Sequence, residues 1–175
     1  ILSKGGVPKV RVFTKIWLAL FDQWDWKGTP NMPPELILFP SWAPFNIYEF
    51  SSWARATIVP MLIILTDRPY CPIPESANID ELFPGGREAT DYALPKPNAG
   101  LGWSKALYWA DRLIGLFQRL PVHPLRGTAR RKIVQWVLDH QEADGAWGGI
   151  QPPWVYSLIA LHHLGYPDDH EVMKR

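Results

Sequence analysis

The sequence predicts an all-α fold that is part of an α/α barrel, a double ring of helices. Helical periodicity recurs along the 175 residues, and no stretch longer than four residues alternates as a half-buried strand would. Near the C-terminus, an amphipathic segment is followed by a glycine-rich turn and then by a wholly apolar segment. An outer helix shows one face to water and an inner helix shows none, so repetition of this pair builds two concentric layers of helices.

The first 66 residues are predicted to be mainly helical. Apolar side chains mark one helix face within residues 9–20, at Phe13, Ile16, Trp17 and Leu20. Prolines interrupt residues 21–44, where we expect a long connection with one helical turn at 34–38. Residues 46–65 are apolar on nearly all sides, which predicts a buried helix that Pro60 kinks or divides.

A Pro/Gly-rich excursion is predicted for residues 67–102, and helical periodicity returns in residues 103–175. The segment 103–118 has an apolar face that we expect to point inward, at Ala106, Ala110, Leu113 and Phe117. In the next predicted helix, Ala129, Ile133 and Val137 or Trp136 point inward. Pro153 suits the first turn of the last long helix, and Gly165 suits its end.

Composition and charge exclude several classes of protein. Hydrophobic residues make up 47% of the chain, with ten tryptophans and 18 prolines, which favours a packed fold over disorder. The net charge of +1 argues against a nucleic-acid partner. The basic residues that cluster on one predicted helix face are interpreted as a solvated face: Arg126, Arg130, Arg131 and Lys132. The five histidines form no metal-ligand pair, so no metal or cofactor is expected.

The first residues of the sequence and its single cysteine give expectations about where in the cell the protein lies. A single cysteine, Cys71, is typical of a protein from a reducing compartment. The first residues lack the charged start and apolar core of a signal peptide, so we do not expect a secreted protein. There is no initiator methionine, and we expect this sequence to be a piece of a longer chain. Its uninterrupted apolar run at 58–65 is much shorter than the roughly 20 residues of a membrane span.

The turn QEADGAWGG, residues 141–149, carries the most specific pattern in the sequence. Gln141 follows the predicted end of a helix, where backbone carbonyls lack helical partners. Its amide can donate a hydrogen bond and accept another, so we expect it to clamp that helix end to the next pair. The spacing of Gln141, Gly145 and Trp147 matches the QW motif of the triterpene cyclases.

Three longer strings strengthen this resemblance. NIYEFSSWARAT at 46–57, GGIQPPW at 148–154 and KVRVFTKIWLAL at 9–20 resemble the squalene–hopene cyclases, and the likeness extends over essentially the whole sequence. There are small departures, since Val137 replaces an aromatic residue or leucine and Asp22 stands where a glycine is expected. The resemblance implies part of the N-terminal half of a terpenoid cyclase toroid, one incomplete domain over residues 1–175.

The resemblance also implies a reaction and a set of site residues. Squalene–hopene cyclases protonate squalene and cyclise it through carbocations to hopene and hopanol. By this resemblance, Trp53, Ile150, Gln151 and Pro152 line the substrate cavity, and Phe50 and Ile58 lie at the narrow part of the substrate channel. Gln151 helps to hold the water that ends the reaction.

The acidic D-x-D-D motif that starts the family reaction does not occur in this sequence. The similar string YPDD ends in Asp168 and Asp169, but Tyr166 takes the place of the first aspartate, so we interpret it as a helix start. These residues alone are therefore expected to be inactive. They would supply part of the cavity wall and position water, without providing the acid.

The resemblance further implies a peripheral, monotopic enzyme on the cytoplasmic side of a bacterial membrane, with squalene as substrate, no cofactor and scope for a homodimer of the full-length protein. Two alternatives stay open. One is another triterpene cyclase, of the oxidosqualene or tetrahymanol type. The other is a non-enzymatic helical-repeat binding module, which would be expected to carry several repeat copies and a polar groove.

Overall fold

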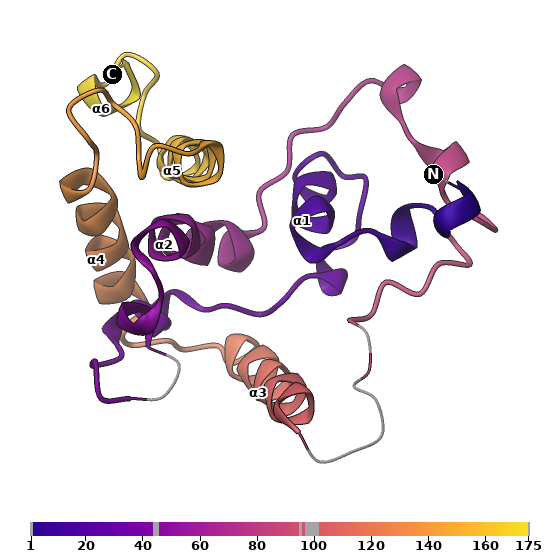
Figure 1. Ribbon diagram of the computed structural model, residues 1–175, viewed down its shortest axis with the longest axis horizontal. Coiled ribbons are helices and arrows are strands. Elements are labelled where there is room, and N and C mark those ends of the chain that lie inside the picture. The colour runs from indigo at the N-terminus through magenta and orange to yellow at the C-terminus, as the bar shows by residue number, and fades with distance from the viewer. Residues whose placement is uncertain (1, 44–45, 95, 97–101, 175) are drawn as a thin grey trace. The chain divides into compact units, whose positions relative to one another are not determined.

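A computed structural model describes residues 2–43, 46–94, 96 and 102–174 (Figure 1). Every regular element in these ranges is an α-helix or a short 3-10 helix, and none is a strand. This confirms the predicted all-α class.

The chain divides into two compact units, each of which combines segments that are distant in sequence. The first unit comprises residues 1–30 and 68–111, and the second comprises residues 31–67 and 112–175. Most of the Pro/Gly-rich excursion therefore belongs to the first unit, together with the N-terminal segment.

The first unit is built around helix α1, Val12–Leu20. Short 3-10 helices surround it: η1 Leu2–Lys4, η2 Val7–Lys9, η3 Trp26–Gly28, η6 Glu75–Ala77 and η7 Asp80–Leu82. The core is formed by Val7, Ala19, Trp24 and Phe83. Ala19 and Trp24 belong to this core, so the buried face of α1 includes Ala19, which the sequence analysis did not place on it. The predicted buried face is therefore only partly right: Ile16 and Leu20 are buried, whereas Phe13 is 52% exposed.

Helix α1 ends in a turn that explains the unexpected aspartate in the sequence. Asp22 has a φ of 58°, which lies in the left-handed region that favours glycine. The amide of Gln23 donates to the Leu18 carbonyl at 2.7 Å and closes the turn. Aspartate is among the few other residues that tolerate this conformation, so the turn forms without glycine.

The second unit contains three long helices, α2 Ser52–Asp67, α4 Arg126–Asp139 and α5 Gln151–His163. Figure 1 shows α2 beside both α4 and α5, and it packs against each of them. Smaller elements complete the unit: η4 Pro34–Leu38, η5 Ile47–Glu49 and α6 Glu171–Lys174. The predicted helical turn at 34–38 is confirmed as η4.

Helix α2 is the most buried element, as its apolar composition predicts. Its residues 59–65 are all buried. Pro60 lies inside the helix, which continues across it as one element, so the predicted division does not occur.

Helix α3, Trp103–Gln118, has the bounds that the sequence predicts but not the predicted burial. No residue of α3 is buried, and Leu113 is 65% exposed. The apolar face of this helix is therefore uncovered in the described chain.

Candidate functional site

The predicted glutamine clamp is present at the end of α4. The side-chain amide of Gln141 donates to the carbonyl of Gly145 at 3.1 Å and to the carbonyl of Val172 at 2.9 Å. The first bond closes the turn, and the second reaches α6, beyond the next long helix. Gln141 thus fixes the segment that enters α5 and the segment that leaves it.

Trp147 occupies the interior of the same turn. Its side chain is 1% exposed, and its indole Nε1 donates to the carbonyl of Val137 at 2.7 Å. That carbonyl belongs to the last turn of α4, where helical partners run out. The tryptophan therefore caps α4 while it fills the core, which explains why a loop carries so large an apolar ring.

After Trp147 the chain turns sharply into α5. Gly148 and Gly149 both have positive φ, 67° and 61°. A Cβ built on Gly148 would lie 3.8 Å from the Cβ of Ala56 in α2. The Gly148 amide also donates to the Glu142 carboxylate at 3.2 Å. The turn thus lies against the first half of α2.

The predicted cavity residues come from the adjoining beginnings of α2 and α5. Trp53 lies in the first turn of α2 and is 59% exposed. Ile150 immediately precedes α5, and Gln151 and Pro152 begin it. Ile150 and Gln151 are exposed, whereas Pro152 is half-buried. The structure therefore brings two of the strings identified in the sequence together and leaves the Trp53 indole accessible.

The two predicted channel residues occupy different settings. Phe50 lies in extended backbone between η5 and α2 and is 43% exposed. Ile58 is half-buried within α2. Asn46 fixes the start of the Phe50 segment, because its side chain accepts hydrogen bonds from the Tyr48 and Glu49 amides.

Arg55 is a residue of this region that the sequence analysis missed. Its guanidinium Nη2 donates to the carbonyl of Tyr48 at 3.2 Å and to the carbonyl of Phe50 at 3.0 Å. The guanidinium carbon lies 5.9 Å from the centroid of the Tyr48 ring. No periodicity in the sequence predicts hydrogen bonds from a helix side chain to the loop that precedes the helix, so this contact of Arg55 was not foreseen.

Ion pairs correct the interpretation of the basic cluster. Arg130 forms a two-pronged contact with Asp67, and His163 approaches the same carboxylate at 3.0 Å. Arg126 pairs with the buried Glu35 at 3.1 Å. Arg126 and Arg130 are therefore half-buried structural residues, and the prediction of a solvated face is wrong for them. Arg131 and Lys132 are exposed, as predicted.

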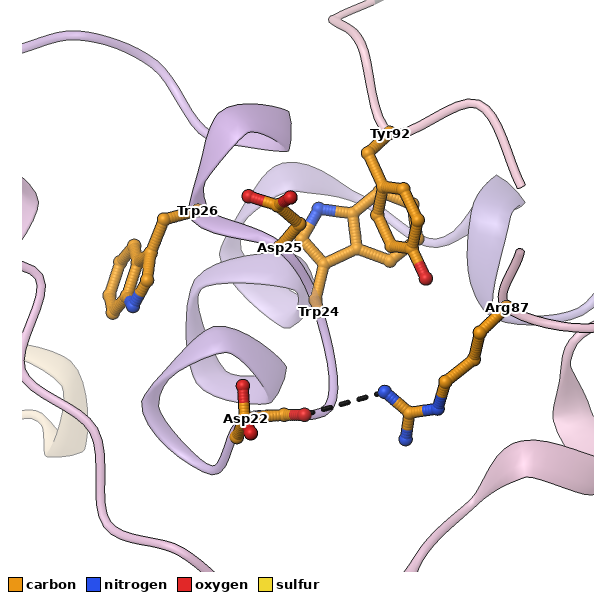
Figure 2. Close-up of a pocket in the computed structure, with 6 residues that line it drawn as sticks. All are labelled: Asp22, Trp24, Asp25, Trp26, Arg87 and Tyr92. Atoms are coloured by element: carbon orange, nitrogen blue, oxygen red, sulfur yellow. Dashed lines mark hydrogen bonds between the residues drawn. The ribbon is translucent and has the colours of Figure 1, made fainter. Parts of the chain in front are cut away.

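The first unit contains a pocket of about 310 Å³, shown in Figure 2. It is lined by Asp22, Trp24, Asp25, Trp26, Arg87 and Tyr92. Arg87 donates to the Asp22 carbonyl at 3.3 Å and also bonds the side chains of Gln23 and Asp80. Since its guanidinium is already committed to these partners, the pocket offers no free cation to a ligand.

Two groups near Trp24 have shifted pKa values. Burial lowers the pKa of Lys15, with a further lowering by Lys9 and an opposing effect of Asp91. The Lys15 ammonium lies 4.3 Å from the Trp24 ring centroid. Burial raises the pKa of Tyr92, which Arg87 partly offsets. These groups fit the packing of the first unit and do not form a catalytic pair.

The carboxylates of YPDD lie at the surface, as the helix-start interpretation predicts. Asp168 is 86% exposed and lies 3.3 Å from His162. Asp169 is also exposed, and α6 begins shortly after it.

Helix α3 carries the most conspicuous exposed apolar surface. Its apolar residues have neighbours three or four positions away along the helix and so share one broad face. They are Trp103, Ala106, Leu107, Trp109, Ala110, Leu113, Ile114, Leu116 and Phe117. Lys105 and Arg112 lie on the other face. None of the described helices combines the length and apolar character that crossing a membrane requires.

Comparison with known protein families places the whole sequence in one of them. The family described as the squalene-hopene cyclase N-terminal domain matches residues 1–175.

Individual relatives agree with this match. A squalene–hopene cyclase of Alicyclobacillus acidocaldarius is 43% identical over 94% of this chain and 25% of its own length. A squalene hopane cyclase of Aspergillus fumigatus is 37% identical over 95% of this chain and 23% of its own length. A dammaradiene synthase of Dryopteris crassirhizoma is 36% identical over the whole chain and 25% of its own length. The chain thus spans about a quarter of the length of these relatives.

Proposed function

The chain belongs to the squalene–hopene cyclase N-terminal domain family, and we propose that the protein of which it forms part cyclises squalene to hopene and hopanol. The observation that carries this proposal, beyond the family itself, is the meeting of α2 and α5. The turn before α5 lies against Ala56 in the first half of α2, so the beginning of α2, which carries the accessible Trp53, and the beginning of α5, which carries Gln151, belong to the same pair of packed helices.

This arrangement suits a reaction that proceeds through carbocations. A cation over a desolvated indole face gains about 2 kcal/mol, and the indole has no basic lone pair that would quench the cation. We assign this role to Trp53. Ile150 and Pro152 would exclude water from the same wall, and the remaining walls and the initiating acid would come from other parts of the full protein.

We assign the end of the reaction to Gln151. An exposed amide at the start of an otherwise apolar helix can hold a water molecule through its carbonyl and its NH₂ group. That water would remove a proton from the last cation to give an alkene, or add to it and then lose a proton to solvent to give an alcohol. In the full protein the helices would continue the outer and inner pairing of α4 and α5 into an α/α barrel.

Attachment to a bilayer surface is the second part of the proposal. Squalene is an apolar polyene, so an enzyme that draws it from a bilayer needs an apolar surface for docking. Helix α3 offers tryptophan, leucine and phenylalanine on one face and the charged residues Lys105, Asp111 and Arg112 on the other, an amphipathic pattern that suits a helix lying in the membrane interface. We propose that α3 attaches the full protein to the cytoplasmic side of a bacterial membrane.

Gln151→Ala in the full-length protein tests the assigned role. We expect the ratio of alkene to alcohol to change while the rate of squalene consumption falls much less, because protonation occurs at the far end of the substrate. Gln135→Ala, an exposed glutamine on α4, is the matched control. An equal loss of every product with an unchanged ratio would assign Gln151 a structural role only.

The products also discriminate the alternatives. A cyclase of the oxidosqualene, tetrahymanol or dammaradiene type would give other cyclic products under the same conditions. A non-enzymatic binding module would leave squalene unchanged. The proposal of hopene and hopanol rests on the family and on the 43% identity to one squalene–hopene cyclase, and the products decide between it and a dammaradiene-type cyclase, whose relative is 36% identical.

A further inference from the structure

Arg55 holds the segment that carries Phe50. This segment is extended backbone between η5 and α2, and the Phe50 amide makes only a long hydrogen bond of 3.4 Å to the Ile47 carbonyl. On the carbonyl side, the guanidinium Nη2 of Arg55 binds both Tyr48 and Phe50, at 3.2 and 3.0 Å. Asn46 holds the amides of Tyr48 and Glu49 at the start of the segment, whereas Arg55, a charged donor, holds the carbonyls of Tyr48 and Phe50 at its end.

The anchor of this hold is rigid. Arg55 belongs to the first part of α2, and its own amide donates to the Ser51 carbonyl at 2.9 Å. From Ala56 onward α2 is packed into the second unit, where Ala56 and Thr57 are buried. A displacement of the Phe50 backbone therefore requires either loss of the Arg55 hydrogen bonds or movement of a packed helix.

The hydrogen bonds of Arg55 to the loop come with an energetic cost elsewhere in the same side chain. The Arg55 Nε is buried and has no hydrogen-bond partner in the described part of the chain. A buried donor without a partner is destabilising. The side chain nevertheless directs a different nitrogen at two backbone carbonyls, which serves the placement of the loop.

We propose that Arg55 is a positioning residue that fixes Phe50 and thereby sets the width of the substrate channel. The proposal rests on the proposed function and on the placement of Phe50 at the narrow part of the substrate channel, which the family resemblance implies. In this proposal Arg55 acts on substrate entry through the loop backbone, to which its guanidinium is bound.

The test uses the full-length protein with squalene in mixed micelles of fixed composition. For Arg55→Ala we expect kcat/KM to fall about fivefold or more while the ratio of alkene to alcohol is unchanged. Arg55→Lys keeps a charged donor that reaches one carbonyl at a time, so it should recover part of the loss. Arg131→Ala removes an exposed arginine whose side chain donates to the neighbouring Thr128 hydroxyl, and it should leave the kinetics unchanged.

A double-mutant cycle measures whether the effect of Arg55 on kcat/KM depends on the Phe50 ring. If Arg55 acts by placing that ring, adding Arg55→Ala to Phe50→Ala should change kcat/KM less than about twofold further. Fully additive losses would overturn the proposal, as would a change in the product ratio in Arg55→Ala. A variant that fails to fold is replaced in the cycle by Arg55→Gln, which keeps a neutral donor.

Hydrogen exchange separates this inference from the proposed function. In Arg55→Ala the amides of residues 48–51 should exchange faster, with no change in the buried half of α2. If the wild-type protein leaves squalene uncyclised, the proposed function fails, and the exchange result still decides whether Arg55 holds the loop. Unchanged exchange at residues 48–51 overturns the inference even in an active enzyme.

Discussion

Replacement of Trp147 by phenylalanine probes the clamp at the end of α4. The substitution keeps an aromatic ring in a site where the wild-type side chain is 1% exposed, but it removes the N–H that binds the Val137 carbonyl at 2.7 Å. A buried acceptor left without its partner costs about 1–3 kcal/mol. The space left by the smaller ring adds about 1 kcal/mol. We therefore expect the free energy of unfolding to fall by about 2–4 kcal/mol.

Urea unfolding of the 175-residue chain in nonionic detergent, followed by helical circular dichroism, measures this loss. With a slope of about 2 kcal/mol per molar urea, the transition midpoint should fall by about 1–2 M. Trp154→Phe is the matched control, because Trp154 is 48% exposed on α5 and should lower the midpoint very little. If both variants shift the midpoint equally, the Trp147 N–H does not cap α4 and the reasoning is refuted.

Three further substitutions test other contacts. Gln141→Ala removes both amide hydrogen bonds, so hydrogen exchange around Val172 should quicken about tenfold or more. Asp67→Asn removes the charge that pairs with Arg130 in a partly shielded site, and urea titration should show a loss of about 1–3 kcal/mol. Burial lowers the pKa of Lys15 below the usual 10.5, so the unfolded chain binds more protons at this group as the pH approaches that value, and the contribution of Lys15 to stability rises there, opposite in sign to that of Tyr92 with its raised pKa. Lys15→Met should abolish this alkaline gain in urea titrations at successive pH values.

Each of these expectations has a definite contrary result. Equal quickening of exchange throughout α2 would show that Gln141→Ala loosens the whole second unit. A loss in Asp67→Asn no larger than in Asp139→Asn, an exposed position on α4, would show that the ion pair is solvent-screened. An unchanged alkaline gain in Lys15→Met would assign the titration to another group.

The features predictable from the sequence are those that depend on neighbours within a few residues. Gln141, Gly145 and Trp147 lie in one turn, so their spacing alone predicts a clamp at the end of α4. The resemblance that led us to expect glycine at position 22 fits the left-handed φ of Asp22, although the sequence alone predicted no such conformation. Continuous apolar composition likewise predicts the burial of α2.

Contacts between distant segments were not predictable. Asp67 meets Arg130 across 63 residues and His163 across 96, and nothing local to Arg130 distinguishes it from the exposed Arg131. Exposure of the apolar face of α3 was also missed, because helical periodicity identifies a face without identifying what covers it. The approach of the turn before α5 to Ala56 in α2 needed the structure, since the two strings are separated by about half of the chain.

The central claim is that the full protein converts squalene to hopene and hopanol. Its most direct test is to purify the full-length protein from membranes, incubate it with squalene in detergent micelles, and identify the products by gas chromatography with mass spectrometry. The account predicts hopene and hopanol, and no product in a heat-denatured control. Recovery of squalene unchanged, or of a different cyclic triterpene alone, would contradict it.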